Sequence, residues 1–94
     1  MKAIWQGHVI AQSDRTIVLG GHHYFPSDCV DRQYLVDSPR RGENRVAGAL
    51  RYYHLQSPSG QREPDAAWHV VAPEGDMAIL ADHIAFEFCV DVVS

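Results

Sequence analysis

Short runs of apolar, aromatic and β-branched residues alternate with turn-forming residues along most of the chain. The first run, "AIWQGHVIAQ" at 3–12, contains Gln6-Gly7, and a second run, Thr16–Leu19, follows the polar residues Ser13 to Arg15. Such runs are typical of β-strands. Glycine accepts positive φ, so Gln6-Gly7 predicts a tight turn or bulge. We expect the two runs to pair as a hairpin around Ser13 to Arg15.

Breaker residues divide the remaining runs. Phe25-Pro26 ends a strand because proline donates no ladder hydrogen bond, and Ser27 is predicted to N-cap a single helical turn through Val30. Further strands are predicted over Tyr34 to Val36, 45–55, 65–72 and 84–93, with polar loops at 37–44 and 56–64. Gly48, inside the predicted strand 45–55, indicates a bulge or a close backbone approach.

One segment has a helical period. Met77, Leu80 and Ile84 follow Pro73 at i, i+3 and i+7, after the acids Glu74 and Asp76. The pattern predicts one short helix near the C-terminus. Taken together, the elements predict a single mostly-β domain over 1–94, barrel-like or sandwich-like.

Composition narrows the possible functions. The 94 residues are 46% hydrophobic and 21% charged, as in an ordinary globular domain. A net charge of −4 disfavours nucleic acid and anionic membranes as partners, and the one local basic cluster is Arg40, Arg41 and Arg45. Neither a signal-peptide pattern nor a membrane-spanning apolar run is present. We therefore expect a cytoplasmic protein in which Cys29 and Cys89 are free thiols.

The segment "GGHHYFPSDCVD", 20–31, has the residue types of an active site. Asp28 and Asp31 are three apart, which is the wrong spacing for paired metal-binding carboxylates along a strand, so we interpret them as solvated acids. Cys29 begins the predicted helical turn, but no base is placed against it, and a small buried side chain is the favoured interpretation.

The predicted hairpin brings histidines together in either of two registers. With a three-residue loop His22 lies diagonal to His8, and with a two-residue loop His23 does, at about 7–8 Å between Cα atoms. A metal site needs a third ligand, and none has a recognised spacing. We therefore expect no metal and no cofactor.

Several segments together resemble a known family. "KAIWQGHVIAQSDRTIVLGGHHYFP", "YYHL", "DAAWHV" and "HIAFEFCVDV" resemble, in order and spacing, the small bacterial domain-of-unknown-function family 427, sometimes labelled nucleotidyltransferase-like. The best-matched pieces are Trp5-x-Gly7, His23-Tyr24-Phe25-Pro26, Tyr52-Tyr53, Asp65-Ala66-Ala67-Trp68 and Ala85-Phe86. The resemblance implies a compact, bent β-sheet of the tent or sandwich kind with a short helix.

The chain departs from the family pattern at three places. Where family members commonly carry Cys-Pro-Trp-Lys-Gly, residues 44–48 are Asn-Arg-Val-Ala-Gly, so only the glycine remains; His69 replaces a tyrosine, and Glu87 a tryptophan. If the family's cysteine and lysine carry a reaction, this chain is either a non-catalytic relative or one with a shifted function.

Tyrosine, tryptophan and histidine in the matched segments are the strongest functional signal. Their apolar bodies and single polar groups suit a small-ligand pocket or a partner-binding face, although a small β domain also uses them to fill its core. Tyr52 and Tyr53 must point to opposite sides of their strand, leaving at most one in the core. We predict a surface that binds a small molecule or a protein partner, formed by His23, Tyr24, Tyr53, Trp68 and His69. The alternative is a nucleotidyltransferase-like enzyme, and a hairpin edge or exposed aromatic is the candidate surface for a homodimer.

Overall fold

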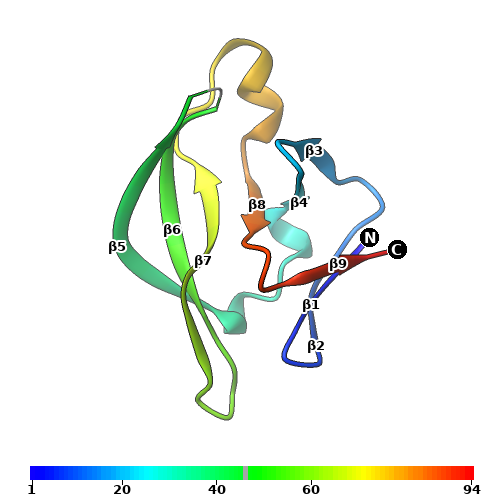
Figure 1. Ribbon diagram of the computed structural model, residues 1–94. Coiled ribbons are helices and arrows are strands. Elements are labelled where there is room, and N and C mark those ends of the chain that lie inside the picture. Colours follow the sequence, from blue (N-terminus) through cyan, green and yellow to red (C-terminus); the bar gives the residue numbers. More distant parts are fainter. Residues whose placement is uncertain (46) are drawn as a thin grey trace.

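A computed structural model describes residues 1–45 and 47–94; Val46, one of the five residues that replace the family stretch, lies outside them. The described chain is built from β-strands and three short 3₁₀ helices (Figure 1). The strands are β1 (Lys2–Trp5), β2 (His8–Gln12), β3 (Ile17–Leu19), β4 (His22–Pro26), β5 (Leu35–Asn44), β6 (Gly48–Gln56), β7 (Arg62–Val70), β8 (His83–Phe86) and β9 (Asp91–Val93), and the helices are η1 (Ser27–Cys29), η2 (Arg32–Tyr34) and η3 (Gly75–Leu80). The predicted mostly-β class is confirmed.

The strands form two antiparallel sheets. One has the order β2-β1-β9, and the other has the order β3-β4-β8-β7-β6-β5. The long, curved strands β5, β6 and β7 lie on one side of the molecule, and β1, β2 and β9 lie on the other, with the two chain ends side by side (Figure 1). No helix in the described ranges is long and apolar enough to cross a membrane.

Two glycine-containing turns determine the pairing of the first four strands. Gln6-Gly7, with φ of 52° and 77°, joins β1 to β2, which confirms the predicted tight turn. Gly20-Gly21, with φ of 61° and 82°, joins β3 to β4 in the same way. Two successive residues with positive φ match the twist of a two-residue hairpin. The predicted pairing of β2 with β3 is therefore wrong, because the two strands pair with β1 and β4 instead and lie in different sheets.

Paired bulges bend the larger sheet at its middle. The β5–β6 register shifts between Asp37 and Arg41, and the β6–β7 register shifts between Tyr53 and Leu55, opposite the extra residues Pro64 to Ala66. Extra residues in one strand increase local bend and twist. The predicted loop at 37–44 is wrong: these residues belong to β5, and the bulge accommodates Pro39 within the strand.

The short helices differ from the predicted ones. The predicted turn after Pro26 is confirmed as η1, but Ser27 does not cap it, because Pro26 occupies the cap position without a side-chain hydrogen bond. The helix predicted from Met77, Leu80 and Ile84 is not confirmed, since η3 is a 3₁₀ helix and Ile84 lies in β8. A 3₁₀ helix repeats every three residues, which is enough to turn both Met77 and Leu80 toward the core.

The larger sheet carries a hydrophobic cluster on each face. The cluster between the two sheets includes Trp5, Phe25, Leu55, Ile84 and Phe86. The opposite cluster includes Tyr24, Leu50, Trp68, Val70 and Leu80 and is covered in part by Ile17, Leu19 and Met77. Both faces are therefore partly covered, and side chains on neighbouring positions of β6 and β7 enter different clusters.

Candidate functional site

Strand alternation separates the predicted site residues onto two faces of the larger sheet. Tyr53 packs against the cluster between the sheets, and Tyr52 against the opposite one, so the prediction that they point to opposite sides is confirmed. Tyr52 pairs directly with Trp68 across β6 and β7. Since His69 follows Trp68, it lies on the Tyr53 face. Neither tyrosine is among the fully buried core residues, and each packs, partly buried, against one cluster, which agrees with the prediction that at most one enters the core.

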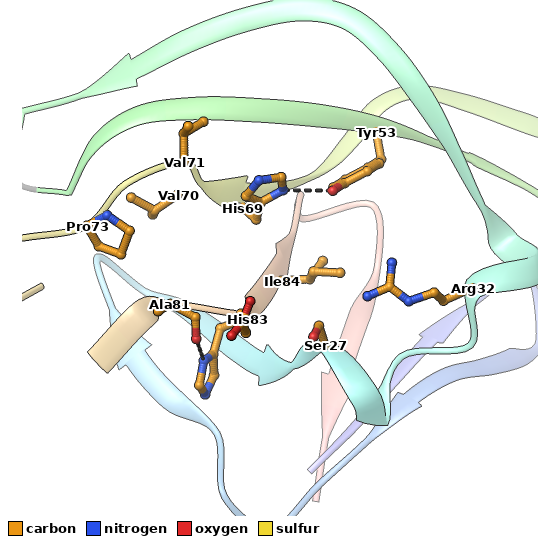
Figure 2. A pocket seen from close by; sticks show the side chains of 11 residues that line it. Ser27, Arg32, Tyr53, His69, Val70, Val71, Pro73, Ala81, His83 and Ile84 are labelled. Atoms are coloured by element: carbon orange, nitrogen blue, oxygen red, sulfur yellow. Dashed lines mark hydrogen bonds between the residues drawn. The ribbon is translucent and has the colours of Figure 1, made fainter. Parts of the chain in front are cut away.

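Tyr53 and His69 line a pocket of about 210 Å³, here called the Tyr53–His69 pocket (Figure 2). The Tyr53 hydroxyl is hydrogen-bonded to Nδ1 of His69 at 2.7 Å. Whichever of the two donates, the pair keeps one O–H or N–H free to donate to a ligand. The other walls come from η1, η2 and the segment 70–84, including Ser27, Arg32, Val71, Pro73, Asp82 and Ile84.

The surroundings of His69 favour its neutral form. Burial lowers the pKa of His69, and the guanidinium group of Arg51 lowers it further, as do Arg32 and Arg41 more weakly. The carboxylate of Asp82 acts in the opposite direction. Burial is thus the main reason that the imidazole of His69 is neutral, and the nearby arginines add to it.

Backbone contacts fix the floor of this pocket. Ser27 N–H donates to the carbonyl oxygen of Asp82 at 2.7 Å, which joins η1 to the start of β8. Asp82 has a φ of 58°, a conformation that aspartate tolerates better than most residues. Nδ1–H of His83 donates to the Ala81 carbonyl at 2.7 Å, and its ring is turned away from the Tyr53–His69 pair (Figure 2). Asp82 is thus held at the pocket edge, whereas the His83 ring is directed elsewhere.

A second and larger pocket, about 450 Å³, lies on the opposite face and is called the Trp68 pocket. Trp68 and Tyr24 are 6% and 2% exposed, and the indole N–H donates to the Tyr24 hydroxyl at 3.2 Å. Tyr52 and His22 form two further walls. The predicted residues Tyr24 and Trp68 are therefore together, but they are separated by the sheet from Tyr53 and His69.

His23 belongs to neither of these pockets. It pairs with Val18 in the β3–β4 hairpin, and its Nδ1 is hydrogen-bonded to the Thr16 hydroxyl at 3.0 Å. It instead lines a third hollow with Phe88 and Val90. The histidine that contacts Trp68 is His22, with ring centroids 4.8 Å apart.

The predicted approach of His8 to His22 or His23 is wrong. His8 pairs with Trp5 in the β1–β2 hairpin, and its ring lies 5.5 Å from that of Tyr34. His22 donates its Nδ1–H to the Phe86 carbonyl on β8. In residues 1–45 and 47–94, no group of three histidine, cysteine, aspartate or glutamate side chains is placed to hold a metal ion.

The remaining candidate groups are exposed or free. Asp28 and Asp31 are exposed, and Asp31 accepts a hydrogen bond from the backbone N–H of Gln33 at the start of η2. Cys29 and Cys89 are free thiols, as predicted. Burial and the carboxylates of Glu63 and Glu87 raise the pKa of the Cys89 thiol, which keeps it protonated and weakly nucleophilic.

Arg32 and Asp82 are the pocket residues that sequence reasoning missed. Arg32 lies in a polar segment with no ligand-like spacing, and Asp82 precedes a strand with no motif around it. Arg32 lies in η2 and Asp82 directly before β8, and the fold brings both to the Tyr53–His69 pocket from positions distant in sequence. The sequence pointed toward His22 only because it adjoins the predicted site residue His23. Deciding which of the two histidines faces Trp68 requires the true register of β3 and β4.

The fold and its two pockets define a small antiparallel β domain with a ligand-sized hollow on each face of its larger sheet. A family model described as "Domain of unknown function (DUF427)" matches residues 1–93, so the chain belongs to that family, as the sequence resemblance predicted. No curated protein matches the chain with significant similarity.

Proposed function

We propose that the protein binds a small molecule carrying a carboxylate or phosphate group in the Tyr53–His69 pocket. The observation that carries the proposal is the convergence of donors on one hollow. Arg32, Ser27 and the Tyr53–His69 pair line it, and all of them can donate hydrogen bonds. An oxyanion needs several donors at once, and a guanidinium group supplies two in a fixed geometry.

The charges near the pocket support an anionic ligand. Arg32, Arg41 and Arg51 each lower the pKa of His69, against the single opposing carboxylate of Asp82. Because His69 stays neutral near pH 7, it contributes a hydrogen bond without adding a charge. Asp82, which also lines the pocket, would repel a second negative charge on the ligand.

The apolar walls and the volume limit the size of the ligand. Val71, Pro73 and Ile84 contribute apolar groups to the lining. A pocket of about 210 Å³ is below the roughly 300–1,000 Å³ of drug-sized sites. The proposed ligand is therefore a small metabolite with one anionic group and a short apolar part.

Thermal-shift titration tests the proposal with matched pairs of probes. Glycerol 3-phosphate is compared with glycerol, and lactate with lactamide. We expect stabilisation by the anionic member of at least one pair, because a ligand at 100 times its Kd adds about 2.7 kcal/mol of stability. If neither anion raises Tm, the proposal is wrong.

Two variants localise the effect. Arg32→Ala removes a charge-assisted contact of about 1.5–3 kcal/mol, so Kd should rise at least tenfold, and Tyr53→Phe should weaken binding several-fold. Arg15→Ala, an exposed arginine outside the pocket, is the matched control and should bind normally. Equal binding by Arg32→Ala and Arg15→Ala would place the anion elsewhere.

The nucleotidyltransferase-like activity stays a prediction. ATP and GTP, each with Mg²⁺, are tested as further ligands in the same thermal-shift titration. Stabilisation by a nucleotide that is lost in Arg32→Ala would connect that activity to this pocket. The free thiols Cys29 and Cys89 support the proposed cytoplasmic location, where thiols stay reduced. A protein partner and a homodimer are the remaining proposals for the aromatic surface, and light scattering measures the latter.

A further inference from the structure

The Trp68 pocket differs in chemistry from the Tyr53–His69 pocket, although the two lie on one sheet. Its floor is aromatic, formed by Trp68 and Tyr24, and the partly exposed rings of Tyr52 and His22 rise from it. Around the Trp68 ring, centroid distances are 6.4 Å to Tyr24, 6.2 Å to Tyr52 and 4.8 Å to His22. All three neighbours are tilted or edge-on to Trp68, so the four rings surround a hollow instead of forming one stack.

Two carboxylates stand at this aromatic hollow. Glu43 on β5 and Glu87, directly after β8, both line it. Within the described residues, neither carboxylate has a hydrogen-bonding or ion-pair partner. Among residues 1–45 and 47–94, no arginine or lysine lines the pocket. The pocket therefore carries negative charge and π-electron faces together, which is the combination that attracts an organic cation.

Two contacts within the chain occupy parts of the ring walls. The guanidinium carbon of Arg40 lies 4.6 Å from the centroid of the Tyr52 ring, so a ligand cation would share this ring with Arg40 or displace it. His22 donates Nδ1–H to the Phe86 carbonyl, and its ring stacks on that of Phe88 with centroids 4.5 Å apart. These two contacts hold the His22 ring in place at the pocket wall.

We propose that the Trp68 pocket is a second binding site, specific for a small organic cation of the alkylammonium class. Tyr52 and His22 supply accessible aromatic surface above the nearly buried rings of Trp68 and Tyr24, and Glu43 and Glu87 supply the counter-charge. With a volume of about 450 Å³, the pocket has room for a substituted ammonium group. The site is independent of the proposed anion pocket, because the sheet separates the two and they share no lining residue.

The test uses cations and a neutral molecule of the same shape. Choline and butylammonium are titrated into the full chain, with 3,3-dimethylbutan-1-ol as the uncharged isostere of choline, and binding is followed by NMR of the indole N–H of Trp68. We expect at least one cation to shift this signal saturably and the alcohol to bind about fivefold or more weakly. Equal binding of the alcohol would overturn the proposal, as would no shift with either cation.

Charge-neutral variants separate electrostatics from fold. Glu87→Gln and Glu43→Gln keep the shape of the pocket, and each should weaken cation binding about threefold to tenfold, as expected for a partly exposed charge. Glu74→Gln, an exposed acid outside the pocket, is the matched control and should leave binding unchanged. Arg32→Ala should also bind cations normally, so failure of the anion proposal does not affect this one. Unchanged binding by the Glu43→Gln, Glu87→Gln double variant would overturn the proposal.

Discussion

The hydrogen bond between Trp68 and Tyr24 joins β7 to β4 beneath the Trp68 pocket and allows a sharp test of the structure. The indole N–H donates to the Tyr24 hydroxyl at 3.2 Å, and the rings meet edge-on with centroids 6.4 Å apart. Tyr24→Phe removes the hydroxyl and leaves the ring in place. Because the ring packing is retained, any loss of stability reports on the hydrogen bond.

The expected magnitude follows from burial. Tyr24 is 2% exposed and Trp68 is 6% exposed, so water has little access to an indole N–H that has lost its acceptor. A buried donor without a partner costs about 1–3 kcal/mol. For a domain of this size, each kcal/mol lowers Tm by roughly 4–8 °C. We therefore expect Tyr24→Phe to lower Tm by at least about 4 °C.

Urea unfolding followed by tryptophan fluorescence measures the effect, with Tyr34→Phe as the matched control. Tyr34 is also buried, at 7% exposure, but its hydroxyl has no hydrogen-bond partner in the described chain and is not itself buried. Tyr34→Phe should change the free energy of unfolding by less than about 0.5 kcal/mol. If the two variants lose equal stability, the Tyr24–Trp68 hydrogen bond does not contribute as argued.

Two further variants test other parts of the structure. The pKa of His69 is lowered on folding, so below pH 6.5 the unfolded chain binds more protons than the folded chain. Stability should therefore fall as the pH drops through and below 6.5, stay flat above it, and fall less in His69→Asn. Equal slopes of the urea midpoint against pH, from 7.5 to 5, in the two proteins would contradict this. A Cβ on Gly42 would lie 2.8 Å from Cε2 of Tyr52, so Gly42→Ala should destabilise the protein by about 1–3 kcal/mol through overpacking. Tyr52→Leu should remove most of that penalty in a double variant, and a full penalty there would show that the clash is not with Tyr52.

Local patterns predicted the elements better than their partners. The strand runs and the Gln6-Gly7 turn follow from alternation and from glycine at positive φ, which depend on neighbouring residues alone. Gly20-Gly21 carries the same signal, but the hairpin predicted around Ser13 to Arg15 does not exist, and the turn that does form lies at these two glycines. Strand pairing joins residues distant in sequence, so the misplaced hairpin also misplaced His8 relative to His22 and His23.

The bulges of β5 and β7 account for the other main difference. Pro39 inside "DSPRRGEN" predicts a loop, because proline interrupts a ladder. The structure keeps a ten-residue strand by placing this proline at a register shift, opposite a strand that continues without interruption. Tertiary pairing with β6 thus overrides a local signal, and no pattern in a single strand indicates when that will happen.

The candidate site was predicted by residue type and missed in its geometry. Alternation by one residue divides the predicted tyrosine, tryptophan and histidine side chains between a pocket lined by Arg32 and Asp82 and one lined by Glu43 and Glu87. Tyr52 with Trp68 and Tyr53 with His69 stay on separate faces because the β6–β7 register is regular from Leu50 to Tyr53 and shifts after it. A slip of one residue would exchange the two sets of side chains between the faces. The bulge lets the sheet bend next to the two pockets without such a slip. The position of the extra residues in β7 therefore determines which side chains of β6 and β7 face each pocket.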